Sequence, residues 1–160
     1  MTRGIHPVIV GGGLVAVLDI AAAFALRGAF GSPPIRVLQG IASGVLGPAA
    51  FQGGVSTAAL GMVLHVAIAF VVAAVYYVVS RWWSWLVRHP VASGLVYGVA
   101  VHLVMNEIVL PLSRLTFRRP PWYVVVSLVA IHMVCVGLPI SLSVAHADDP
   151  RRKAAEVPTA

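Results

Sequence analysis

Long stretches without a charged residue constrain the fold of this chain more than any other feature of its sequence. Four intervals contain no Asp, Glu, Lys or Arg, namely Arg3 to Asp19, Arg36 to Arg81, Arg88 to Glu107 and Arg119 to Asp148. A helix needs about 20 apolar residues to cross the hydrocarbon core of a bilayer, so these intervals allow repeated crossings. The composition, 59% hydrophobic and 10% charged, lies outside the range of soluble domains. We therefore predict an integral membrane protein.

The apolar runs predict an all-α polytopic fold, a bundle of four transmembrane helices in one domain over residues 1–145. The spans are expected at residues 8–26, 57–79, 91–112 and 122–145. The polar tail at residues 146–160 is predicted to be disordered. The first run also has features of a cleaved signal peptide, but Asp19 within the run argues against cleavage, because such segments are uniformly apolar.

Glycines and prolines break the first half of the long uncharged stretch, so it does not form two full spans. Ser32 followed by Pro33 is a helix-start signal, and the apolar residues after it recur at helical spacing. We predict a short amphipathic or re-entrant helix at residues 33–46, with residues 35–54 either re-entrant or interfacial. Aromatic residues at the end of the second span predict an interfacial belt, made of Tyr76, Tyr77, Trp82, Trp83 and Trp85.

The net charge of +6 would suggest nucleic acid as the partner of a soluble chain. Here the arginines stand at the ends of apolar runs, where they act as interfacial anchors, so we expect the bilayer as partner and no nucleic acid. A homo-oligomer or another membrane protein is a further partner that fits. Four spans put both termini on one side, which collects six positive residues against five on the other. This margin barely discriminates, and we adopt cytoplasmic termini as the working orientation.

Polar side chains within the predicted spans fall on faces that also carry small residues. Gly94, Gly98, His102 and Asn106 recur every four residues on the third span. Gly12 shares a face with Asp19 on the first span, and Gly61 shares a face with His65 on the second. Small residues let helix backbones approach closely in a membrane, so we expect Gly12, Gly61, Gly94 and Gly98 at helix contacts. The polar groups should then point into the bundle.

Four of these polar side chains are also predicted to lie at a similar depth in the membrane. Counting about 1.5 Å per residue along each span places Asp19, His65, His102 and His132 within about 5 Å of the midplane. Glu107 lies nearer one interface, with Arg114 or another helix as its expected partner. Pro111 and Pro139 each remove a backbone hydrogen bond and are expected to kink the third and fourth spans.

The polar layer supports three functional interpretations. In the first, Asp19, His65, His102, Asn106, Glu107 and His132 are candidates for a site that handles protons or ions, since intramembrane ionisable groups are functional by default and an imidazole titrates near neutral pH. In the second, the protein is a structural or accessory subunit whose polar layer only fixes helix packing. In the third, His65, His102 and His132 ligate haem or a metal.

The sequence lacks the usual signatures of cofactor or catalytic chemistry. Cys135 is the single cysteine, which excludes an internal disulfide and a multi-thiolate metal site. There is no Cys-x-x-Cys-His or Glu-x-x-His motif. We therefore expect no cofactor and no metal, and we do not expect an enzyme.

Several short motifs together resemble a known family. They are Gly12-Gly13-Leu14, Leu18-Asp19-Ile20, Ile41-Ala42-Ser43-Gly44, Ala50-Phe51-Gln52-Gly53-Gly54, Leu64-His65, Ala74-Val75-Tyr76-Tyr77, Met105-Asn106, Val109-Leu110-Pro111-Leu112-Ser113, His132-Met133 and Val136-Gly137-Leu138-Pro139-Ile140. As a set, over residues 11–140, they resemble a family of small uncharacterised bacterial inner-membrane proteins, which is distantly similar to the YagU-like proteins. The resemblance implies a bacterial inner-membrane location and four helices, and it implies no chemistry. Asp19, His65, Asn106 and His132 match the family pattern, whereas His102 and Glu107 stand where the family has aromatic residues.

Overall fold

The structure, a computed structural model that describes residues 5–114 and 120–148, contains only helices and their connections within those ranges. Four of its helical segments are long and apolar enough to cross a membrane: His6–Gly28, Gly54–Trp82, Pro90–Leu112 and Trp122–Asp148. Each contains the corresponding predicted span. The all-α, four-span bundle is therefore confirmed, and the protein is a multi-pass membrane protein.

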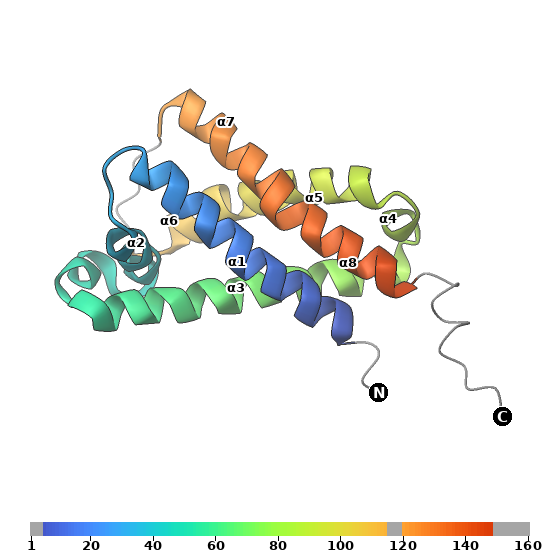
Figure 1. Cartoon of the computed structure of the whole chain (residues 1–160), viewed down its shortest axis with the longest axis horizontal. Helices are drawn as coiled ribbons and strands as arrows, with labels where there is room; N and C mark the ends of the chain where they lie inside the picture. The colour runs from blue at the N-terminus through green and yellow to red at the C-terminus, as the bar shows by residue number, and fades with distance from the viewer. Residues whose placement is uncertain (1–4, 115–119, 149–160) are drawn as a thin grey trace.

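The chain crosses the bundle in alternating directions (Figure 1). Helix α1 (His6–Gly28) leads to α2 (Pro34–Leu46) and a 3-10 turn, η2 (Gly47–Gln52), after which α3 (Gly54–Trp82) returns. The short α4 (Trp85–Arg88) joins α3 to the third span. In Figure 1 the start of α1 and the end of α8 lie at the same end of the bundle as α4, and α2 lies at the opposite end.

The third and fourth spans share an irregularity in front of a proline. The third consists of α5 (Pro90–Val104), a π-helical turn η3 (Met105–Val109) and α6 (Leu110–Leu112). The fourth consists of α7 (Trp122–Ile131), a π-helical turn η4 (His132–Gly137) and α8 (Leu138–Asp148). Pro111 and Pro139 have no N–H to donate, and the residue before each donates five residues back instead of four. The disturbance expected at these prolines thus takes the form of a wider helical turn.

The helices pack most closely at glycines, which have no side chain to keep the backbones apart. A methyl group on Gly98 would collide with the carbonyl of His132 and the Cα atom of Met133, and one on Gly94 would meet the carbonyl of Gly137 at 2.9 Å. The third span therefore lies backbone to backbone against the fourth. Gly61 of α3 faces the carbonyl of Leu38 on α2 in the same way.

Gly12 lies at the contact of α1 with α3, where an added methyl group would meet the ring of Phe70 at 2.8 Å. Helix α1 also packs against the fourth span, since a methyl group on the adjacent Gly11 would lie 3.3 Å from the Cα atom of Ile140. Helix α1 thus lies between α3 and the fourth span, as Figure 1 shows. The faces of small residues identified from the spacing are the faces that bring the helices together.

Two expectations need correction. Tyr76 is not part of an interfacial belt: only 1% of it is exposed, and its hydroxyl hydrogen-bonds to Ser93 Oγ at 2.8 Å and donates to the Leu86 carbonyl at 3.2 Å. A face of small residues on α3 ends at Tyr76, which packs inward. The predicted tail begins too early, because α8 continues through His146 to Asp148. The rest of that tail lies outside the described residues.

Helix α2 packs along the first half of α3 and also touches α1. Gln39 is buried between α2 and α3, where its Nε2 donates to the Gly54 carbonyl at 3.0 Å. The Arg114 N–H, after the third span, donates to the Gly44 carbonyl at 3.0 Å. Helix α2 is thus held to the bundle by polar contacts on two sides, as part of its folded core.

The close contact at Gly98 generates a stability prediction. Gly98→Ala should lower the free energy of unfolding by about 1–3 kcal/mol, because overpacking forces the third and fourth spans apart. The measurement is unfolding of the purified protein in mixed detergent micelles, followed by circular dichroism. Gly13→Ala is the matched control, since a methyl group there meets nothing within 4 Å and alanine favours the helix. Equal stability of the two variants would contradict the close packing at Gly98.

The alternating path generates a topology prediction. Reporters fused after Ala160 and inserted next to Ser32 should report opposite sides of the membrane, because three spans, an odd number, lie between the two positions. Paired alkaline phosphatase and fluorescent-protein fusions measure this directly. Reporters on the same side would contradict the four-span arrangement.

Candidate functional site

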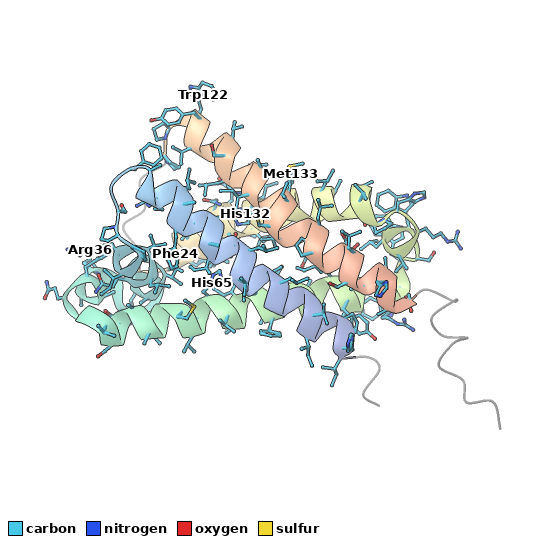
Figure 2. The ribbon with its side chains drawn as sticks, in the orientation of Figure 1. Phe24, Arg36, His65, Trp122, His132 and Met133 are labelled. Carbon is cyan, nitrogen blue, oxygen red and sulfur yellow. The ribbon has the colours of Figure 1, made fainter. Side chains whose placement is uncertain are left out.

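A cavity of about 220 Å³ lies inside the bundle at mid-depth. Its polar lining comes from three spans: Asp19 on α1, His65 on α3 and His132 at the start of η4. In Figure 2, His65 lies between α3 and α1, and His132 lies where the fourth span passes α1. The volume is enough for several water molecules, and a water needs polar partners of this kind. The cavity therefore gathers three of the sequence-predicted candidates.

His65 is buried and bridges two helices. Its Nε2 lies 3.0 Å from the Ala16 carbonyl oxygen on α1. A carbonyl only accepts hydrogen bonds, so Nε2 must carry the proton. In a neutral imidazole the other nitrogen, Nδ1, is then an acceptor. His65 can therefore take up a proton at Nδ1 without breaking its bond to α1.

His132 is anchored in a similar way through the opposite nitrogen. Its Nδ1 donates to the Leu128 carbonyl, one turn earlier in the same span, at 2.7 Å. The neutral ring then has Nε2 as its acceptor. Both histidines that line the cavity thus use one nitrogen for attachment and keep the second available for a proton.

His102 stands behind His132 and does not line the cavity. Its ring is buried and meets the His132 ring edge to face, with 5.1 Å between the ring centroids. The Asn106 side chain, one turn on, donates from Nδ2 to the His102 carbonyl at 2.9 Å and lies 3.4 Å from His102 Nδ1. His102 and Asn106 form a polar pair that supports His132 from the third span.

Asp19 supplies the carboxylate of the cavity and is half-buried. Within the ranges that the structure describes, its side chain makes no hydrogen bond to protein and no salt bridge. A carboxylate inside a membrane is costly unless it is protonated, hydrated or paired. The cavity beside it provides room for water, a proton donor or a cation.

Glu107 is separate from this cavity. It lies in η3, its side chain is exposed, and it is not among the residues that line the cavity. Of the predicted layer, Asp19, His65 and His132 line the cavity and His102 stands behind it with Asn106, while Glu107 lies apart.

The cavity walls are apolar, and two of them come from α2, which the sequence did not connect to the site. Val37 and Ile41 of α2 line the cavity together with residues of the four spans. Their four-residue spacing put them on one helix face, but nothing in the sequence told which partner that face would meet. Helix α2 thus closes the cavity toward the end of the bundle that lies opposite the chain termini.

The haem or metal interpretation concerns His65, His102 and His132. Among the described residues no group of three His, Cys, Asp or Glu side chains is close enough to hold a metal ion. The rings of His102 and His132 touch directly, so a porphyrin cannot lie between them in this arrangement.

Comparison with known proteins gives no match, whether by protein family, by curated protein or by solved structure.

The anchoring bonds predict different tautomers for the two cavity histidines. In the neutral state His65 should carry its proton on Nε2 and His132 on Nδ1, because each donates from that nitrogen to a carbonyl. Solid-state NMR of the protein with ¹⁵N-labelled histidine in liposomes distinguishes the two forms by their nitrogen shifts. His65→Gln and His132→Gln assign the signals. The same tautomer at both positions would contradict the hydrogen bonds described above.

Proposed function

We propose that this integral membrane protein moves protons across the bilayer through its central cavity, with Asp19 as the proton-binding carboxylate. The observation that carries the proposal is the meeting of one carboxylate and two imidazoles, from three different spans, around a single mid-depth cavity. Ionisable groups within a membrane face the protein interior and mark proton or ion pathways.

The chemistry of these groups supports a proton over a metal ion. An imidazole changes charge near neutral pH, and a carboxylate within hydrogen-bonding reach of water or an imidazole can exchange a proton with it. His65 and His132 each keep one ring nitrogen available while the other holds the ring in place. Each ring can therefore gain and lose a proton while it keeps the bond that holds it in place.

His102 and Asn106 have supporting roles in this proposal. The Asn106 side chain donates a hydrogen bond to the His102 carbonyl, and the His102 ring packs edge to face against the His132 ring. This contact fixes the orientation of the ring that lines the cavity. Glu107 has no assigned role in the cavity, since it lies outside the lining.

The second candidate function is that of a structural or accessory subunit, and the His65 contact favours it. The bond from His65 to the Ala16 carbonyl joins α3 to α1, and such interhelical bonds contribute about 0.6 kcal/mol on average in membrane proteins. On this view the polar groups only fix the positions of the helices. Asp19 distinguishes the two functions, because no such interhelical bond of Asp19 exists in the described part of the chain.

The location proposed for this activity is the bacterial cytoplasmic membrane, with both termini on the cytoplasmic side. The support for an inner membrane is the resemblance of the chain to small inner-membrane proteins, and the cytoplasmic termini are the working orientation adopted from the sequence.

The proposal predicts that Asp19→Asn abolishes proton flux. Purified protein is reconstituted in liposomes loaded with a pH-sensitive dye, and a potassium diffusion potential drives protons inward. Wild-type vesicles should acidify several-fold faster than vesicles without protein. Asp19→Asn and His65→Gln should reduce the rate to that of empty vesicles, because each keeps a polar side chain of similar size and removes a titrating group.

His89→Gln is the control for this experiment, since His89 is exposed beside Trp85 outside the cavity. It should conduct like the wild type. Circular dichroism and gel filtration establish that each variant is folded. A wild-type rate equal to that of empty vesicles, or full activity in Asp19→Asn, would refute proton transport and leave the structural function.

A further inference from the structure

A second hollow, separate from the central cavity, lies on the outer face of the bundle. It is a groove of about 600 Å³ between α1 and the fourth span. None of the residues that line it also lines the central cavity. Its large apolar side chains, among them Val10, Leu14 and Leu142, are exposed, and in a membrane protein such a surface faces the lipid.

The groove is built from one stripe on each helix. Helix α1 contributes His6, Val10, Leu14 and Leu18, and the fourth span contributes Val134, Leu138, Leu142 and His146. Each stripe repeats every four residues, which keeps it on one helix face. The two helices run in opposite directions, so both histidines come to the same end.

The length of the groove corresponds to one leaflet of a bilayer. From His6 to Leu18 the helix rises about 18 Å at 1.5 Å per residue. Half of the hydrocarbon core measures about 15 Å. The inner end of the groove, at Leu18 and Val134, therefore lies near the midplane, where an acyl chain of one leaflet ends.

The polar end of the groove lies at the level of the lipid headgroups. His6 is in the first turn of α1 and His146 is in the last turn of α8, and both side chains are exposed. Imidazole N–H groups donate hydrogen bonds to phosphate oxygens and attract them when protonated. Pro7 has no N–H and the Ile9 N–H donates to the Ile5 carbonyl, and α8 ends at the same level, so the two imidazoles carry the interaction with a phosphate.

We propose that this groove binds a phospholipid, with one acyl chain along the Val10–Leu14–Leu18 stripe and the headgroup phosphate between His6 and His146. The groove is an apolar trough one leaflet long with two imidazoles at its outer end, and its one other polar side chain, Ser143, donates to the Pro139 carbonyl. Such a trough complements a lipid at both ends. If a second copy of the chain filled the groove instead, it would have to insert a row of apolar side chains and also place an anionic group between the two histidines. The proposal does not depend on proton transport, because the two hollows share no lining residue.

Native mass spectrometry tests the proposal. The protein, released from detergent, is titrated with palmitoyl-oleoyl-phosphatidylglycerol. The wild type should retain one lipid per chain. Leu14→Trp should reduce the retained fraction at least fivefold, because the indole fills the trough, and His6→Gln combined with His146→Gln should reduce it by a similar factor.

Val63→Trp is the matched control, since Val63 is an exposed apolar residue on α3, away from the groove. It should retain lipid like the wild type, as should His89→Gln. The proposal is overturned if Leu14→Trp and Val63→Trp lose lipid equally or not at all. It is also overturned if the wild type is a dimer without lipid that Leu14→Trp converts to a monomer, because the groove would then belong to an interface between copies.

Discussion

Lipid tails offer no hydrogen-bonding partner, so polar groups at mid-depth need partners in the protein or in enclosed water, and the rest of this structure depends on that constraint. His65 reaches the Ala16 carbonyl, His132 reaches the Leu128 carbonyl, and Asn106 reaches the His102 carbonyl. Each of these side chains thus donates its hydrogen bond to a backbone carbonyl. Only the His65 bond crosses between helices, and it requires that α1 and α3 approach closely, as they do at Gly12.

The contact of the third and fourth spans shows how the parts are connected. Gly94 and Gly98 bring α5 against the backbone around Gly137 and His132. Just there, the fourth span widens into a π-helical turn that begins at His132. Widened turns of this kind often lie at functional sites. In this protein the turn presents His132 to the cavity and brings its ring against His102.

Much of the architecture could be predicted because hydropathy and length are local properties. Uncharged runs define the spans, and a recurrence of Gly, Ala and polar residues every four positions defines the buried face of α3, where Ala58, Gly61, His65, Ala69 and Ala73 are all buried. Local patterns misled at Tyr76, because an aromatic residue near the end of a span fits either an interfacial belt or a core. Its hydrogen bond with Ser93, on another helix, decided between the two.

The sequence by itself determined the number of spans, because hydropathy and length are local properties. It also identified the faces of α1, α3 and the third span that carry both small residues and polar side chains, because the rotation per residue places side chains around a helix. Only the tertiary structure decided which of those side chains meet. Asp19, His65 and His132 share a cavity and His102 stands behind it, although spacing alone put all four at one depth. Glu107, which spacing already put nearer one interface, does not line the cavity. The same holds for α2, whose Val37 and Ile41 complete the cavity wall. The physical reason is that relative rotation and neighbour choice among helices depend on contacts between residues distant in the chain, which no periodicity within one helix encodes.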